Sequence, residues 1–116
     1  ESAFYRCSTL QSITIPESAT KIGRYTFYGC STLQSIVIPK GIKKIEEYTF
    51  SGCTALTTVT LPVGVNKFDD TSFEKCEALT TIYVPAKKAD YYKQRLPEEL
   101  HSLIVELQPE KKAKKK

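Results

Sequence analysis

The 116-residue sequence contains one histidine, His101, and it lacks a Gly-rich phosphate loop, a GxSxG motif and any CxxC pair. These absences leave few side chains from which a nucleophilic, phosphate-binding or zinc site can be built. Acidic residues that are adjacent in extended chain point in opposite directions, unlike the facing carboxylates of a glycosidase. The adjacent pairs are Glu46-Glu47, Asp69-Asp70 and Glu98-Glu99. We therefore predict that the protein is not an enzyme and has no catalytic residue, cofactor or metal, and that His101 is a surface residue.

The sequence also lacks a long apolar run and an overall excess of charge. No apolar stretch approaches the roughly 20 residues that span a bilayer, so we expect no membrane insertion of this segment. The net charge of +4 arises in residues 110–116, and the rest of the chain has equal numbers of basic and acidic residues. The body therefore lacks the basic bias of a nucleic-acid-binding protein, and we expect the Lys-rich tail, residues 110–116, to be solvated and disordered.

A repeat with a constant period of 23 residues runs through most of the chain. Four cysteines mark it, and apolar residues and prolines keep the same spacing in further columns. A fixed period of this length is the signature of a solenoid, in which each repeat buries its apolar side against its neighbours. The columns are Cys7, Cys30, Cys53, Cys76; Phe4, Phe27, Phe50, Phe73; Leu10, Leu33, Leu56, Leu79; Ile13, Ile36, Val59, Ile82; Ile15, Ile38, Leu61, Val84; and Pro16, Pro39, Pro62, Pro85.

The repeat predicts one strand and one return path in each coil. The alternation Ile36 in, Val37 out, Ile38 in is a strand pattern, and Pro39 ends the strand because it has no N–H for a parallel ladder. Glycine at positions 41 and 64 supplies permissive backbone for the following corner. Small residues before each Phe suggest a short 3₁₀ or helical turn that closes the coil. The return path carries a second inward column, Ile22, Ile45 and Phe68, beside Ala19, Ile42 and Val65.

These elements predict an α+β solenoid, a stack of leucine-rich repeats with a parallel sheet of about four coils. We expect the solenoid to occupy residues 1–85, with units near 7–29, 30–52 and 53–75 and a partial unit at 76–85. Because the chain opens directly on the repeat frame, we expect it to belong to a longer protein with more repeats, a cap or a secretion signal upstream.

Residues 86–109 depart from the repeat, and we predict that they form a C-terminal helical cap. The return column is expected to continue at Tyr91 within a helix over 86–95. Pro97 suits the first turn of a second short helix. Residues 103–107 are expected to form a last strand or an extended segment over the sheet edge.

The four cysteines leave three possibilities open: a column of reduced thiols, two disulfides, or a metal site. Equivalent positions stack in adjacent coils, and free cysteine behaves as a small hydrophobe, which favours buried thiols. Four cysteines in a short chain are also compatible with two disulfides.

The columns resemble the BspA-like leucine-rich repeats, whose unit runs roughly C-x-x-L-x-x-I-x-I-P-x-x-V-x-x-I-G-x-x-A-F-x-x-C. The chain matches this unit in residues 7–16, in Ile22-Gly23 and in residues 27–30, and twice more up to Cys76. The family often ends in Ile-Tyr-Val-Pro and a helix with a tyrosine, and residues 82–92 look similar. The resemblance covers residues 2 to about 107. Its departures are Thr26, Thr49 and Ser72 in place of Ala, and Glu46 and Asp69 in place of Gly.

The resemblance implies an extracellular or cell-surface protein of bacteria. Some members of the family are adhesins, and their partners include host matrix proteins and other bacterial surface proteins. We expect a non-catalytic recognition or adhesion module that binds a protein through its concave sheet face. A carbohydrate-binding or spacer module of a larger envelope protein is the first alternative, and an enzyme of unknown chemistry is the second.

The strand positions that point away from the core form the candidate partner-binding face. They are uncharged and rich in hydroxyls, so they can hydrogen-bond a partner at low desolvation cost, and Tyr83 is the candidate anchor. A purely structural explanation is also open, because Ser and Thr suit strands and threonines pair well between strands. Tyr25 and Tyr48, with Tyr5 and Tyr28, either cover the core edge or recognise a ligand. The candidate residues are Ser12, Thr14, Ser35, Val37, Thr58, Thr60, Thr81 and Tyr83.

Overall fold

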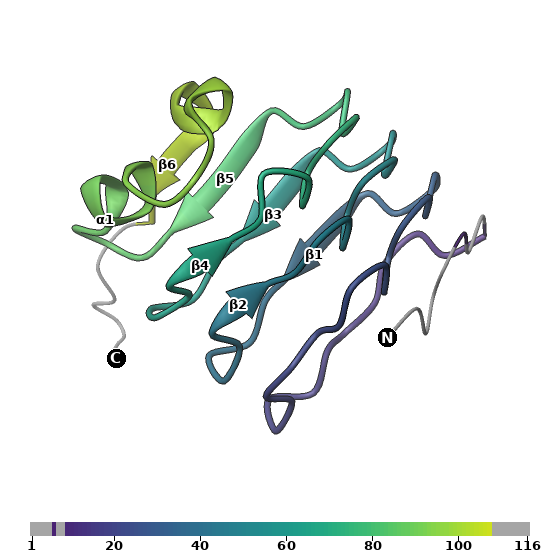
Figure 1. The fold of residues 1–116 in the computed structure, drawn as a ribbon, viewed down its shortest axis with the longest axis horizontal. Helices are drawn as coiled ribbons and strands as arrows, with labels where there is room; N and C mark the ends of the chain where they lie inside the picture. The colour runs from purple at the N-terminus through teal and green to yellow at the C-terminus, as the bar shows by residue number, and fades with distance from the viewer. Residues whose placement is uncertain (1–5, 7–8, 108–116) are drawn as a thin grey trace, which may run out of the picture.

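The chain winds through coils that stack side by side, as the ribbon shows in a computed structural model that describes Arg6 and residues 9–107 (Figure 1). Equivalent strands of successive coils pair in parallel, and their Cα partners are 23 residues apart. A four-stranded sheet has the order β1-β3-β5-β6, and a two-stranded sheet pairs β2 with β4. The strands are β1 (Ser35–Val37), β2 (Lys44–Ile45), β3 (Thr58–Thr60), β4 (Lys67–Phe68), β5 (Thr81–Val84) and β6 (Ile104–Glu106).

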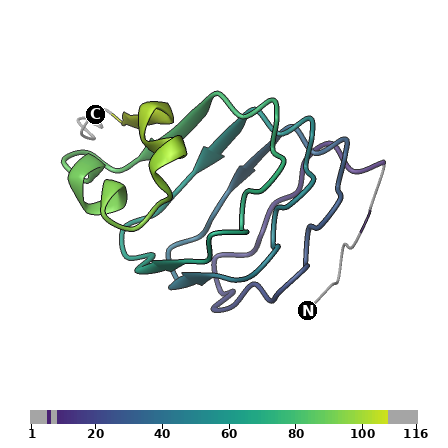
Figure 2. The ribbon, with the colours of Figure 1, turned by 45° about the horizontal axis from the view of Figure 1, so that its top comes forward.

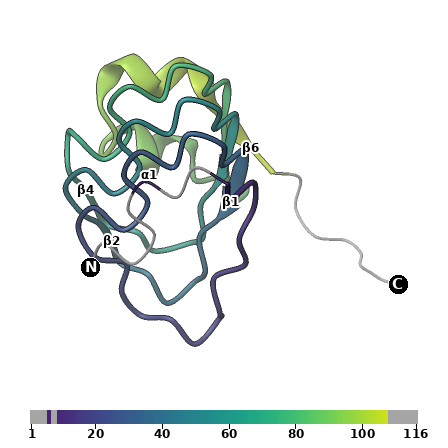
Figure 3. The same ribbon diagram turned by 90° about the vertical axis from the view of Figure 1, so that its right-hand side faces the viewer.

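The two sheets lie on opposite sides of the coil, with the core between them (Figure 3). Most of the residues predicted to point inward are buried, including Ile36, Val59 and Ile82 in the strands and Ile22, Ile45 and Phe68 on the return path. Ile13, Ile15 and Ala19 of the first coil, and Cys76, are half-buried against the same core. The predicted parallel sheet and its inward columns are therefore confirmed for the described repeats.

The sheet is assembled differently from the expected one. Its four strands come from three repeats and from β6, which follows the last repeat and pairs with β5. Residues 12–14 of the first coil do not form a strand, although the Gln34 N–H next to β1 donates to the Gln11 carbonyl at 2.9 Å.

The closing turns, visible in Figure 2 as the bends between successive strands, are hydrogen-bonded turns and not the expected 3₁₀ or helical segments. Single bonds span three residues, such as Tyr28 N–H to the Tyr25 carbonyl and Cys30 N–H to the Phe27 carbonyl. Tyr25 (φ 63°) and Gly29 (φ 69°) adopt left-handed backbone, which interrupts any run of helical residues. The prediction was wrong because these left-handed positions are occupied partly by tyrosine, which gives no sequence signal for them.

The two corner glycines are required for different reasons. Gly64 has φ +102°, so its backbone conformation favours glycine as expected. At Gly41 φ is not positive, but a Cβ would lie 2.6 Å from the Ala19 carbonyl oxygen of the preceding coil. Close contact between the coils therefore excludes a side chain at position 41.

The C-terminal segment contains α1 (Ala89–Lys93), η1 (Glu98–Leu103) and β6. The first helix is shorter than predicted, since Lys87 has left-handed backbone (φ 68°) and a turn replaces the expected first helical residues. Pro97 immediately precedes η1. The role of residues 86–109 as a cap remains a prediction, and residues 108–116 lie outside the described part of the chain.

The return column is continued by Tyr92 and not, as predicted, by Tyr91. Tyr92 is fully buried, and its ring contacts Phe68 edge-on with centroids 5.9 Å apart. Its hydroxyl donates to the Pro62 carbonyl and accepts from the Val65 N–H at 3.2 Å. Tyr91 is half-buried and lies 3.7 Å from the Arg95 guanidinium. The helical turn therefore directs the second tyrosine of the pair into the core.

Candidate functional site: the outward sheet face

The eight candidate residues lie together on what we call the outward sheet face. In β1, β3 and β5 the middle residues Ile36, Val59 and Ile82 are buried, and the flanking residues are more exposed. Strand pairing sets the flanking residues in two rows across the sheet. Ser12 and Thr14 continue the rows in the first coil and are exposed. The rows are Ser12, Ser35, Thr58, Thr81 and Thr14, Val37, Thr60, Tyr83.

The hydroxyls of this face make no hydrogen bond within the described part of the chain. The neighbouring column behaves differently. The Thr57 hydroxyl donates to the Gln34 carbonyl at 3.1 Å, and the Thr80 hydroxyl donates to the Thr57 carbonyl at 3.3 Å. The hydroxyls of Thr57 and Thr80 therefore have a structural role, since each bonds to the main chain of the neighbouring strand's coil. The hydroxyls of Ser35, Thr58, Thr60 and Thr81 are available to a ligand.

The sequence reasoning missed one member of the face, Val105. It pairs in register with Tyr83, so it extends the row that contains Val37 and Thr60. Val37 is 61% exposed and Val105 is 46% exposed. Val105 lies outside the 23-residue period, and the one sequence signal for it is the strand or extended segment predicted over residues 103–107.

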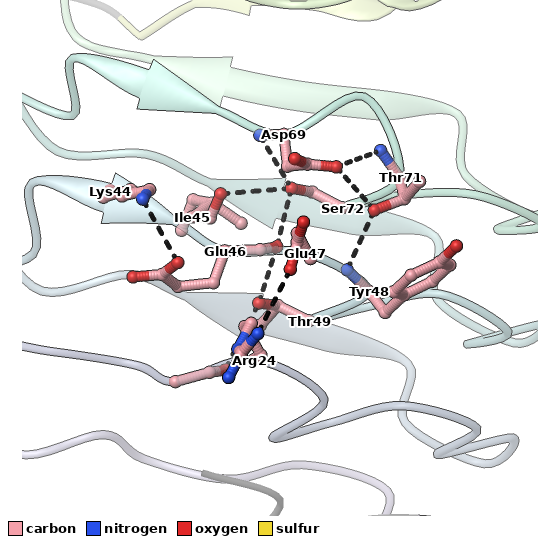
Figure 4. Close-up of polar contacts among 11 residues, drawn as sticks. Arg24, Lys44, Ile45, Glu46, Glu47, Tyr48, Thr49, Asp69, Thr71 and Ser72 are labelled. Carbon is pink, nitrogen blue, oxygen red and sulfur yellow. Dashed lines mark hydrogen bonds and ion pairs between the residues drawn. The ribbon is translucent and has the colours of Figure 1, made fainter.

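Charged side chains gather instead on the return side of the coil (Figure 4). Lys44 Nζ lies 3.3 Å from a Glu46 carboxylate oxygen, and Arg24 lies 3.5 Å from the Glu47 carboxylate. A hollow of about 370 Å³ there is lined by basic and acidic side chains in equal number. Opposite charges already pair on this surface, so it offers no strong preference for a charged ligand.

Two of the polar residues that replace the family's alanine, Thr49 and Ser72, reach the neighbouring coil (Figure 4), and the Thr49 hydroxyl does so at 3.4 Å from the Gly23 carbonyl. The Thr49 hydroxyl donates to the Glu46 carbonyl at 2.9 Å, and the buried Ser72 hydroxyl donates to the same carbonyl at 2.9 Å from the next coil. The Thr71 hydroxyl and N–H donate to the Asp69 carboxylate at 2.6 and 3.0 Å, which lowers the pKa of that carboxyl. These polar groups have a structural role, because each of them forms its hydrogen bonds within the fold.

The tyrosine side chains of neighbouring coils pack against one another. The rings of Tyr25 and Tyr48 are 5.2 Å apart and 12° from parallel, and Tyr28 lies edge-on to both. Mutual stacking covers a face of each ring, and a sugar would need such a face for stacking. The charge of Glu74 is the main cause that raises the pKa of the Tyr48 phenol. The arrangement favours covering of the core edge, and Tyr5 lies outside the described residues.

Cys30, Cys53 and Cys76 are reduced thiols. The Cys53 Sγ–H donates to the Phe27 carbonyl at 3.1 Å, and the Cys76 Sγ–H donates to the Phe50 carbonyl at 3.0 Å. Burial raises the pKa of Cys53 strongly and that of Cys76 to about 12. The disulfide alternative is wrong for these three cysteines, while Cys7 lies outside the described part of the chain.

Other candidate groups are placed as follows. A ring nitrogen of the half-buried His101 lies 3.0 Å from the Leu96 carbonyl oxygen. Among residue 6 and residues 9–107, no three His, Cys, Asp or Glu side chains are grouped so that they could hold a metal ion. None of the helices in that same part is long and apolar enough to span a membrane.

Parallel strands joined by 23-residue coils and filled by columns of Leu, Ile and Phe define a leucine-rich-repeat protein. The model of the family described as BspA type leucine rich repeat region (6 copies) matches residues 1–96, so the chain belongs to this family. The predicted family is thereby confirmed.

A search of solved structures finds the crystal structure of a leucine rich cell surface protein from Faecalibacterium prausnitzii A2-165. It has a TM-score of 0.54 and 18% sequence identity, and the match covers 90% of the present chain. The present chain spans 33% of that protein, and the likeness concerns the fold alone. No curated protein matches the chain.

Proposed function

We propose that the protein is a non-catalytic recognition module, secreted or at the cell surface, that binds a protein partner through the outward sheet face. The observation that carries this proposal is the unpaired, charge-free array of hydroxyls on that face. Membership of the BspA type family and the fold shared with a leucine rich cell surface protein support the proposed location.

The chemistry of the face suits a protein partner. A hydroxyl both donates and accepts, so each side chain can satisfy either kind of backbone or side-chain group. Because the face carries no charged side chain, binding there avoids the cost of desolvating a charge. Tyr83, Val37 and Val105 supply apolar contact in the same row. Partners of this kind include a host matrix protein or another bacterial surface protein.

Substitution of Thr60, which lies in the central strand β3 of the three repeat strands, tests the proposal. Binding of the whole chain to a panel of immobilised matrix proteins and glycans is compared with binding of Thr60→Glu. Thr54→Glu is the matched control, because Thr54 is exposed in a closing turn outside the face. We expect a matrix protein to bind the unmodified chain and Thr54→Glu but not Thr60→Glu.

Two further properties of the binding reaction are expected. The affinity should change little between low and high salt, since no charged side chain lies on the face. Melting curves should show that Thr60→Glu remains folded. Binding that survives Thr60→Glu but is lost in Thr54→Glu or Tyr48→Ala would exclude the outward sheet face. Binding of no panel member would favour the spacer alternative.

A further inference from the structure

Strand β6 forms an open edge of the four-stranded sheet. Its neighbour on one side is β5, and no strand pairs with its other side in the part of the chain that the structure describes. The Leu107 N–H, just beyond β6, donates to the Val84 carbonyl of β5 at 2.8 Å. Figure 1 shows β6 at the end of the row of strands.

The alternation of a parallel ladder determines which main-chain groups face away from β5. Because Leu107 bonds towards β5, Val105 does so as well, and Ile104 and Glu106 direct their main-chain groups to the open side. The Ile104 N–H is used within the chain, since it donates to the His101 carbonyl. The Ile104 carbonyl and the Glu106 N–H have no hydrogen-bond partner among the described residues.

The side chains of β6 leave this edge accessible. Val105 is 46% exposed and continues the outward sheet face. Glu106 points to the opposite side of the sheet, where its carboxylate accepts from the Ala89 N–H at 3.0 Å. No proline interrupts β6, and its one charge is tied to the start of α1. Two common devices that protect natural edge strands, a proline and a charge directed across the edge, are absent from β6 itself.

From this arrangement we infer that β6 pairs antiparallel with β6 of a second copy of the chain, about a two-fold axis at Val105. In that register the Glu106 N–H of each copy donates to the Ile104 carbonyl of the other. Three groups are left over on the open side of one chain, the Ile104 carbonyl and the N–H and carbonyl of Glu106. A two-fold pairing at Val105 uses the Glu106 N–H and the Ile104 carbonyl of each copy, which gives two hydrogen bonds between the chains. Val105 then faces Val105, which buries two exposed valines in a close cross-strand pair.

The pairing joins the two four-stranded sheets into one sheet and places both outward sheet faces on one continuous surface. A second copy suits this position because the outward sheet face next to β6 carries no charge, so no like charges are opposed across the axis on that face. If the proposed function holds, the dimer presents two equivalent recognition surfaces, and an array of partners would be bound with higher avidity.

Charge exchange at position 105 tests the dimer. Sedimentation equilibrium of the whole chain should show a concentration-dependent dimer, and Val105→Glu and Val105→Lys should each weaken association at least tenfold. An equimolar mixture of the two variants should restore it, because opposite charges then face each other. Val37→Glu is the control, since Val37 is also an exposed valine on the same face but lies in β1. It should leave the dimer intact.

Deletion of the hydrogen bond gives a second, independent test. Glu106→Pro removes the outward N–H and should abolish the dimer, whereas Glu106→Ala keeps the N–H and should retain it. A chain that stays monomeric at millimolar concentration, a mixture that fails to reassociate, or a Val37→Glu variant that disrupts as strongly would each overturn the pairing. Thr60→Glu should still dimerise, so failure of partner binding and failure of the dimer are separable.

Discussion

Phe27 and Phe50, which occupy the same position in successive coils, stack with ring centroids 5.4 Å apart and planes only 2° from parallel. Phe50 stacks in the same way on Phe73, at 5.4 Å and 5°. The backbone beside the rings is also paired, since the Phe27 N–H donates to the Thr49 carbonyl at 2.9 Å. The coils are therefore held at this side by both ring contacts and main-chain hydrogen bonds.

Replacement of Phe50 by alanine should destabilise the protein by about 3–5 kcal/mol, because a fully buried ring between two others leaves a cavity. The free energy of unfolding is to be measured by urea denaturation. Tyr25→Ala is the comparison, since Tyr25 is partly exposed at the coil surface. It should cost less than Phe50→Ala. A loss below about 1 kcal/mol for Phe50→Ala would contradict the stacked register.

The sequence predicts the core of the repeats well because a constant period forces equivalent residues to stack. Cys53, Leu56 and Val59 are buried as their columns require. The outward sheet face follows from the same argument, since positions that alternate with buried ones must point away. The alternation alone therefore identifies Ser35 and Val37 as outward residues of β1.

The 23-residue period does not predict two other features of the structure. Residues after Pro85 are in no register with the repeats, so the choice between Tyr91 and Tyr92 depended on where α1 begins. Val105 joins the row of Tyr83 after 22 residues, which a 23-residue frame does not predict. The positions of Tyr92 and Val105 are determined by the tertiary contacts of the C-terminal segment and not by the repeat.

The thiols should react slowly in the native protein. The thiolate is the reactive form, and burial raises the pKa of Cys53 and Cys76, so little thiolate exists near neutral pH. Labelling with iodoacetamide, followed by mass spectrometry of the peptides, should find Cys30 and Cys53 protected and Cys76, which is half-buried, labelled sooner. The same labelling in urea gives the unprotected rate. Equal rates for Cys53 with and without urea would exclude the buried thiol column.

Removal of the Tyr92 hydroxyl should weaken the attachment of α1 to the last full coil. Tyr92→Phe keeps the ring against Phe68 but leaves the Val65 N–H and the Pro62 carbonyl without their partner. We expect a loss of about 1–3 kcal/mol in the free energy of unfolding, typical of a buried polar group left unsatisfied. Tyr91→Phe is the matched control, because the Tyr91 hydroxyl makes no hydrogen bond within the described residues. An equal effect of both substitutions would refute the assignment of Tyr92 to the return column.

The carboxyl group of Asp69 should make stability depend on pH at the acid end. Hydrogen bonds from Thr71 lower its pKa in the folded protein below the ordinary value of 3.8. A carboxyl with a depressed folded pKa contributes stability above its unfolded pKa, and that contribution is lost as the pH falls through the folded pKa. Asp69→Asn should therefore be less stable than the unmodified chain near neutral pH, and the difference should shrink as the pH is lowered below 3.8.

Titration of the Asp69 carboxyl by NMR measures the pKa of this one residue directly. The measured pKa should lie below 3.8 in the unmodified chain and should rise towards that value in Thr71→Val, which removes the donating hydroxyl. Thr71→Val also leaves the Tyr48 N–H without its acceptor, so it should lower stability at every pH in addition to its effect on Asp69. A pKa at or above 3.8 in the unmodified chain would show that the Thr71 hydrogen bonds do not form in solution.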